Sequence, residues 1–266
     1  MHARSALFDL YGDHLRSRGG QAPIAALVKL LAPLGIAPPA VRTAVSRMVR
    51  QGWLEPVRLP GGPGYGLTPR AVRRLDDAAA RIYRTGDTTW RGRFDLLVFT
   101  SPVDRTVRPR LEATLTYLGY AALERGTWLS PRPAGELDAV LAEFGVTAQR
   151  FSAEPVGGIA EAMAVVRRAW DLDRLAEAYR RFIAEAEPML AAVGTHPSDE
   201  AAYAARFRLV HAWRNFLFQD PCLPAELLPH PWPGTIAAQF FNRYALQLRP
   251  AADRYVDSCL ADHSGR

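Results

Sequence analysis

The segment "AVRTAVSRMVRQGWL" at residues 40–54 restricts the chain to few folds. At about 100° per residue, a helix through it has one apolar side, formed by Val41, Ala44, Val45, Met48 and Val49. The opposite side carries arginines and hydroxyls, namely Arg42, Thr43, Ser46, Arg47 and Arg50. Such a helix must bury its apolar side against neighbouring elements while its cationic side faces outward.

The segments around this helix supply elements to pack against. Residues 4–17 and 23–31 show helical spacing, and the breaks "RGG" and "PLGIAPP" follow them. The segment at 53–68 predicts two short strands around a glycine-proline tip, and helical spacing returns at 69–84. The order helix, helix, turn, helix, hairpin, helix is typical of a winged helix-turn-helix domain.

Positive charge is concentrated in the same third of the chain. Residues 1–90 hold 12 Arg and Lys29 against six acidic residues, a net charge of +7, whereas residues 91–266 have a net charge of −1. Guanidinium groups bind phosphates and the acceptor edge of guanine. We therefore predict DNA contacts from Arg42, Thr43, Ser46, Arg47 and Arg50 of the helix, and from Arg58 of the hairpin. The alternative is an ordinary amphipathic helix with a solvated arginine face.

The central part of the chain alternates strand and helix patterns. "FDLLVF" at 94–99 predicts a buried strand, helical spacing covers 104–118, and two short strands turn near Gly126. A short helix at 135–144 and a strand within 146–156 follow. The order β-α-β-β-α-β indicates a ferredoxin-like module.

The remainder from residue 158 is predicted to be helical, with Asp171 as a helix N-cap and a proline-rich connection at 220–234. Before this connection, helical spacing at 199–218 predicts a helix that buries Tyr203 and Phe207 among its apolar residues. The helix after the connection is predicted at 235–248. The sequence thus predicts an α+β protein. Its predicted parts are a winged helix-turn-helix domain at 1–84, a linker at 85–92, a ferredoxin-like domain at 93–157 and a helical C-terminal domain at 158–266.

Several segments together resemble a known family. They are "SALFDLYGDHL", "AVRTAVSRMVRQGWL", "YGLT", "WRGRFDLLVF", "GTWLSP", "AWDLDRLAEAYRRF" and "WRNFLFQDPCLPAELLPHPWPG". These segments resemble the PaaX family of transcriptional repressors, named for phenylacetic acid degradation. The resemblance implies a central domain similar to Cas2 proteins. It also implies a homodimer that represses genes of aromatic-compound catabolism and leaves its operator when an aromatic acyl-CoA such as phenylacetyl-CoA binds. One departure is the wing tip "PGGPGYG", which has no basic residue.

Aromatic and cationic residues of the later segments are candidates for binding this effector. Indole rings can line a pocket for an aryl group, and arginines bind phosphates through paired hydrogen bonds. The predicted ligand contacts are Trp128, Arg168, Trp170, Trp213 and Arg214. The alternative is that these aromatic side chains form core.

The sequence predicts no catalytic residue, metal site or resident cofactor. The histidines are scattered, and neither a HExxH nor a CxxC motif occurs. The alternatives are a Cys222 nucleophile with His211 or His230, and a metal at Asp95 if the central domain kept nuclease chemistry. A DNA-binding or scaffolding protein without an effector is another alternative. No apolar run is long enough to span a bilayer and no signal peptide is recognised, so we expect a cytoplasmic protein.

Overall fold

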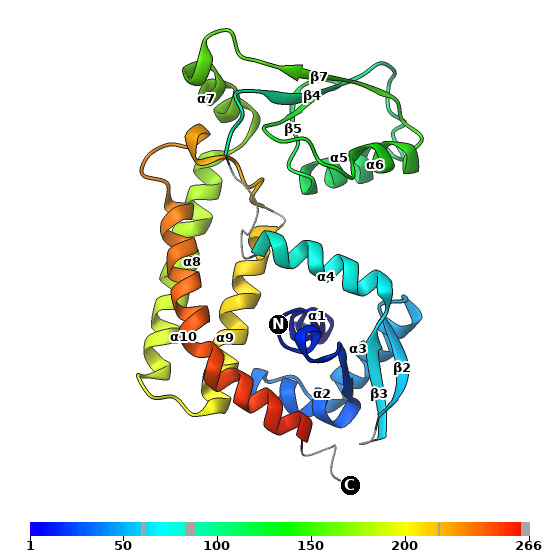
Figure 1. Cartoon of the computed structure of the whole chain (residues 1–266), viewed down its shortest axis with the longest axis vertical. Coiled ribbons are helices and arrows are strands. Elements are labelled where there is room, and N and C mark those ends of the chain that lie inside the picture. The colour runs from blue at the N-terminus through cyan, green and yellow to red at the C-terminus, as the bar shows by residue number, and fades with distance from the viewer. Residues whose placement is uncertain (60–61, 83–88, 218, 262–266) are drawn as a thin grey trace. The chain divides into compact units, whose positions relative to one another are not determined.

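The computed structural model of the protein describes residues 1–59, 62–82, 89–217 and 219–261 (Figure 1). Contacts divide the chain into two compact units. Unit 1 comprises Met1–Thr85, Arg181–Arg214 and Ala237–Arg266, and unit 2 comprises Gly86–Arg180 and Asn215–Ile236. Residues 158–266 therefore contribute to both units. Residues 85–88 of the predicted linker and the wing-tip residues 60–61 lie outside the described residues.

Unit 1 begins with a single helical run. Helix α1 (Ala3–Leu10) continues through a π-helical segment (Tyr11–Leu15) and a 3-10 turn (Arg16–Arg18). The run ends at Gly19, whose φ of 86° suits glycine, so the helix predicted at 4–17 and its stop are confirmed.

The next helices and hairpin also follow the predicted order. Helix α2 (Ile24–Leu31) is separated from α3 (Pro38–Arg50) by a short turn, and the antiparallel strands β2 (Leu54–Leu59) and β3 (Gly62–Leu67) follow. Helix α4 (Pro69–Ile82) begins after Thr68, whose hydroxyl accepts the Ala71 N–H at 3.3 Å. The sequence missed strand β1 (Gln21–Pro23), which pairs with β3. A strand of three residues has no measurable periodicity, and here its partner stabilises it.

The apolar side of α3 is buried as predicted, since Val41, Val45 and Met48 are at most 1% exposed. This core includes α1 and α2, and it extends to α9 (Asp199–Trp213) and α10 (Pro233–Ala261). These C-terminal helices contribute Tyr203, Phe207, Ala252, Val256 and Cys259. In Figure 1, α1 lies between α2, α3, α4 and α9.

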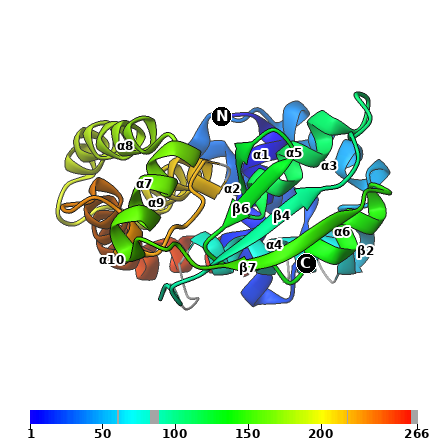
Figure 2. The same cartoon turned by 90° about the horizontal axis from the view of Figure 1, so that it is seen from above.

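Unit 2 contains a four-stranded sheet with the order β5-β6-β4-β7, in which neighbouring strands are antiparallel. The strands are β4 (Phe94–Phe99), β5 (Ala121–Glu124), β6 (Thr127–Ser130) and β7 (Ala148–Ala153). Helices α5 (Arg108–Tyr117) and α6 (Leu137–Glu143) pack on one face through Leu111, Leu115 and Leu137 (Figure 2). The predicted β-α-β-β-α-β order is confirmed.

The rest of unit 2 consists of α7 (Gly158–Ala169), the start of α8 (Leu172–Val193) and the proline-rich segment. The Asp171 carboxylate accepts the Arg174 N–H at 3.0 Å, which confirms it as an N-cap. The segment at 220–232 is irregular apart from a 3-10 turn at Ala225–Leu227.

Two predicted helix ends were wrong. Helix α9 stops at Trp213 and gives way to a 3-10 turn, so it is shorter than the predicted 199–218. Helix α10 continues through Pro250 to Ala261, whereas the sequence predicted an end at 248. Its last turns bury Ala252, Val256 and Cys259 in the unit 1 core, which offsets the hydrogen bond that Pro250 cannot make.

Among the described residues, no helix combines the length and the hydrophobicity that a membrane span requires.

Candidate nucleic-acid interface

The outer face of α3 carries the arginines and hydroxyls that the sequence predicted to contact DNA. Arg42, Thr43, Ser46, Arg47 and Arg50 are all exposed. None of the three guanidinium groups forms an ion pair or hydrogen bond with a described residue. The buried residues on the other side fix the rotation of the helix, because turning it would expose Val41 and Met48. The DNA contacts themselves stay a prediction.

Many acidic side chains of unit 1 are neutralised by ion pairs, and a set of arginines on its N-terminal elements has no ion pair with a described residue. Unit 1 holds 21 basic and 12 acidic residues. Many of its acidic side chains pair with arginines of the same unit: Asp9 with Arg214, Asp13 with Arg206, Asp76 with Arg16, Asp199 with Arg254, and Asp253 and Asp257 with Arg18. Within residues 1–76, the arginines without an ion pair to any described residue are Arg4, Arg42, Arg47, Arg50, Arg58, Arg70 and Arg73.

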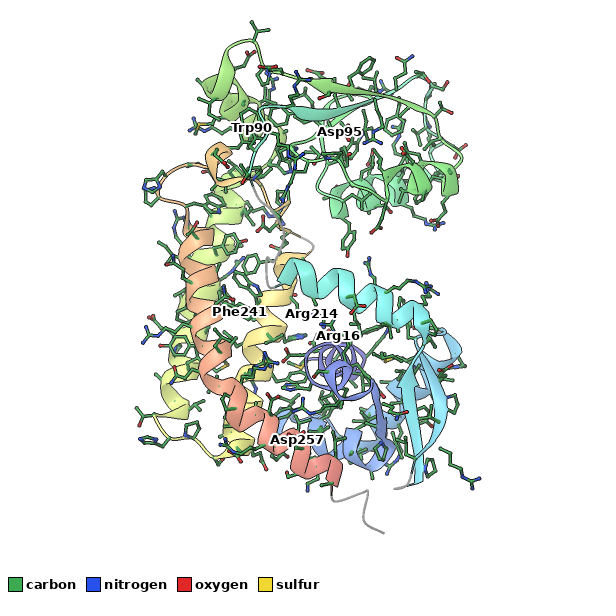
Figure 3. The ribbon with its side chains drawn as sticks, in the orientation of Figure 1. Arg16, Trp90, Asp95, Arg214, Phe241 and Asp257 are labelled. Carbon is green, nitrogen blue, oxygen red and sulfur yellow. The ribbon has the colours of Figure 1, made fainter. Side chains whose placement is uncertain are left out.

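Two of these pairs have buried carboxylates and connect α1 and its π-helical extension to α9 and to the 3-10 turn that follows it. The Asp9 carboxylate, 3% exposed, forms an ion pair with Arg214 and a hydrogen bond with the His211 ring. Arg206 donates to Asp13 at 3.1 Å and to the Ala245 carbonyl at 3.1 Å. Burial, with a smaller effect from Arg249, lowers the pKa of Arg206 to about 10, so the side chain stays charged near neutral pH. Figure 3 shows Arg214 and Arg16 beside α1.

A buried histidine lies next to these pairs. The His14 side chain is 1% exposed and contacts the rings of Tyr203 and Phe207. Its Nε2 is 3.3 Å from Asp13 and its Nδ1 is 3.8 Å from Asp253, so neither nitrogen has a close hydrogen-bond partner. Burial lowers the pKa of His14, Arg18 and Arg249 lower it further, and Asp253 opposes them. Burial likewise lowers the pKa of His211.

We expect this environment to make unit 1 less stable at mildly acidic pH. A histidine whose pKa is lower in the folded than in the unfolded chain favours folding above its unfolded pKa of 6.5. That contribution is lost as the pH falls below 6.5. The free energy of unfolding, measured by denaturant titration at pH 7.5 and pH 5.0, should fall with pH.

The matched variants are His14→Gln and, as a control, His196→Gln at an exposed position. His14→Gln should flatten the pH dependence, because glutamine takes up no proton. His196→Gln should retain the wild-type slope. An unchanged slope in His14→Gln would assign the pH dependence to another group.

The residues predicted to bind an effector fall into both units. Trp213, 3% exposed, stacks on Phe241 in unit 1 with the ring centroids 4.8 Å apart. Figure 3 labels Phe241. Arg214 follows Trp213 and pairs with Asp9. In the structure, both residues therefore have packing or pairing roles.

The other three lie in unit 2. Trp128, 9% exposed, lines a cavity of about 410 Å³ together with Phe99, Arg108 and Arg125. Trp170 lines a different cavity, of about 280 Å³, with Arg174 and Pro221. Arg168 is exposed on α7. The two tryptophans of unit 2 thus do not share one cavity, and the ligand contacts stay a prediction.

The residues of the enzyme alternatives have other partners. The Asp95 carboxylate accepts hydrogen bonds from the Tyr120 hydroxyl and from Arg150, the latter at 3.0 Å. The Cys222 N–H donates to Asp220 at 2.8 Å within the proline-rich segment. No group of three or more metal-binding side chains occurs in the part of the chain that the structure describes.

The sequence missed the buried charges at Asp9, His14 and Arg206. Their signal was present, because these polar residues occupy positions that helical spacing places among buried apolar ones, as in "SALFDLYGDHL". Their partners were not predictable, because Asp9 and Arg214 lie about two hundred residues apart.

Comparison with known proteins identifies the family. Family models match along the chain: "PaaX-like protein" over residues 2–71, "PaaX protein central Cas2-like domain" over 87–165 and "PaaX-like protein C-terminal domain" over 170–258. The chain is also 30% identical over 260 residues to the Transcriptional repressor PaaX of Escherichia coli, which covers 95% of this chain and 82% of the relative. The chain belongs to the PaaX family. The predicted resemblance is confirmed, and the Cas2-like character of the central domain with it.

A solved structure supports the same fold. The uncharacterized protein Rv0674 from Mycobacterium tuberculosis matches with a TM-score of 0.66 and 24% identity. The match covers 97% of this PaaX family chain and 98% of the other. At this identity it is evidence for the fold alone.

Proposed function

We propose that this PaaX family member is a sequence-specific transcriptional repressor whose N-terminal residues form a winged helix-turn-helix domain. Helix α3 is its recognition helix and the β2–β3 hairpin its wing. The observation that carries the proposal is the exposed set Arg42, Arg47 and Arg50, which has no ion pair with any described residue and lies on a helix fixed by its buried side. A mobility-shift assay with the DNA upstream of its own gene tests this proposal. Specific recognition is shown if the protein binds this DNA but does not bind a shuffled sequence.

The side chains of α3 have different roles in this proposal. Arg42 and Arg47 form paired hydrogen bonds with guanine in the major groove, while Thr43 and Ser46 contact base edges or phosphates. Arg50, at the end of α3, binds a phosphate. Arg58 on β2 is the cationic residue that the described part of the wing offers.

The repressor acts as a homodimer on paired half-sites. Two recognition helices on one face of DNA require half-sites about one helical turn apart. The residues of unit 2 hold 12 basic and 15 acidic side chains, so self-association there meets little charge repulsion. This function places the protein with the DNA in the cytoplasm and requires no catalytic step.

An aromatic acyl-CoA, such as phenylacetyl-CoA, releases the repressor from genes of aromatic-compound catabolism. The proposal is supported by membership of the PaaX family and by arginines and tryptophans that line cavities in unit 2, such as those beside Trp128 and Trp170. A ligand that binds the DNA-free form about 100-fold more tightly supplies about 2.7 kcal/mol of coupling. The alternative, a DNA-binding protein without an effector, keeps the same DNA affinity whatever ligand is added.

Calorimetry with phenylacetyl-CoA, free phenylacetate and CoA measures this step directly. We expect phenylacetyl-CoA to bind and Arg168→Gln to weaken binding by about tenfold or more, the effect of losing a charge-assisted hydrogen bond. Arg167→Gln, at the neighbouring exposed position, is the matched control. Absence of binding by all three ligands would exclude this effector and leave the DNA-binding proposal intact.

A further inference from the structure

A pair of aromatic rings adjoins the end of α3. Phe8 of α1 and Trp53, three residues after α3 ends, meet edge to face with their centroids 5.3 Å apart. Each ring lies beneath a guanidinium group: Arg4 is 5.8 Å from the Phe8 centroid, and Arg70 is 4.6 Å from that of Trp53. We call these four residues the arginine–aromatic cluster.

Backbone contacts fix this cluster relative to α3. The Trp53 N–H donates to the Met48 carbonyl of α3 at 2.9 Å. Thr68, two residues before Arg70, donates its hydroxyl to the Gly52 carbonyl at 2.8 Å and its N–H to the Trp53 carbonyl at 3.2 Å. The start of α4 is thereby tied to the chain that leaves α3, so the positions of Arg70 and Arg50 are coupled through backbone.

The two cations of the cluster are exposed and have no acidic partner within the described part of the chain. Arg4 and Arg70 form no ion pair with any residue that the structure describes, although many acidic groups of unit 1 pair with arginines elsewhere. A guanidinium over an aromatic ring is attracted to the negative face of the ring. The ring thus restricts the side chain while leaving its N–H donors available to an anion.

We propose that the arginine–aromatic cluster is a second DNA contact, in which Arg4 and Arg70 bind phosphates of the DNA backbone next to the segment contacted by α3. The inference rests on the proposed function and extends it beyond the α3 face and the wing. Guanidinium groups match phosphate oxygens through paired hydrogen bonds. Since phosphates are present at every base pair, the cluster positions the domain and does not select a sequence.

The test uses the full-length protein and a random-sequence 30-base-pair duplex, whose binding depends on phosphate contacts alone. Each lost contact should reduce the magnitude of the slope of log K against log salt concentration by about 0.9. We expect Arg70→Gln and Arg4→Gln each to show this reduction. Arg70→Lys should keep the wild-type slope, because lysine retains the charge over Trp53.

The matched control is Arg243→Gln. Arg243 is an exposed arginine of unit 1 that also lies over a ring, that of Tyr244 at 5.5 Å, but on α10. Its loss should leave the slope unchanged, which separates a phosphate contact from a general change in net charge. Thermal unfolding of each variant checks that the fold is retained.

Each outcome decides the proposal. If the salt-dependence slope of Arg70→Gln equalled that of Arg243→Gln, the proposed second DNA contact would be overturned. The proposed function would still stand in that case if Arg47→Ala lost operator specificity. If the DNA affinity of the wild-type protein did not depend on salt concentration, both the second contact and the proposed function would be overturned. A reduction in the two glutamine variants, restored by Arg70→Lys, supports the cluster as a phosphate-binding site.

Discussion

Replacing Arg47 with alanine should weaken binding to the operator by about 1–3 kcal/mol, which is about 5- to 150-fold in affinity. Arg47 is exposed near the middle of the outer face of α3, so the substitution removes a base contact without opening the core. Its buried neighbours Val45 and Met48 are untouched. Binding to random DNA should change much less, because phosphate contacts supply most of that affinity. Fluorescence anisotropy with operator and shuffled duplexes measures both quantities.

Arg50→Ala is the comparison variant for this experiment. Arg50 is exposed at the end of α3, where we expect a phosphate contact. Its loss should weaken operator and shuffled DNA by similar factors and leave their ratio unchanged. If Arg47→Ala bound both duplexes as tightly as the wild type, α3 would not be the recognition helix.

Replacing Asp9 with asparagine should lower the free energy of unfolding by about 3–5 kcal/mol. The Asp9 carboxylate is 3% exposed and is the partner of both His211 and Arg214. Asparagine retains the shape but leaves the Arg214 charge, 20% exposed, without its counter-charge. The cost is large because the Arg214 side chain is mostly buried, and a charge there without its partner has lost hydration without compensation. Chemical denaturation at pH 7.5 measures the change.

Asp257→Asn is the matched control, since Asp257 also pairs with an arginine, Arg18, but is 61% exposed. An exposed pair contributes about 0–1 kcal/mol, so this variant should stay close to wild-type stability. The double variant Asp9→Asn with Arg214→Met should recover part of the loss, because it removes the unpaired charge. Equal losses in Asp9→Asn and Asp257→Asn would mean that the Asp9 pair is not effectively buried.

These stability values also bear on the effector. A strong dependence of stability on Arg214 would mean that this side chain holds the turn after α9 to α1. Its loss would then affect ligand binding only through the fold. The effector contacts would in that case be sought among Trp128, Trp170 and Arg168.

Much of the local structure was determined by the sequence. The alternation of Val41, Val45 and Met48 with arginines specified both the helical state of α3 and the side that is buried. The glycines and prolines around 60–66 specified the hairpin. In unit 2, short apolar runs broken by turn residues specified all four strands, and the order of elements restricted the topology to a ferredoxin-like sheet. These features depend on contacts within a few residues, which periodicity and turn chemistry report directly.

Only the tertiary structure decided what each buried face packs against. The sequence marked Tyr203 and Phe207 as buried, yet their partners proved to be α1, His14 and α10. It offered Trp213 and Arg214 as ligand contacts, and the fold stacks one on Phe241 and pairs the other with Asp9. Strand β1 and the continuation of α10 beyond Pro250 likewise depend on partners distant in the chain. The physical reason is that a hydrophobic pattern indicates which side chains are buried, whereas the identity of their neighbours is fixed only when distant segments pack together.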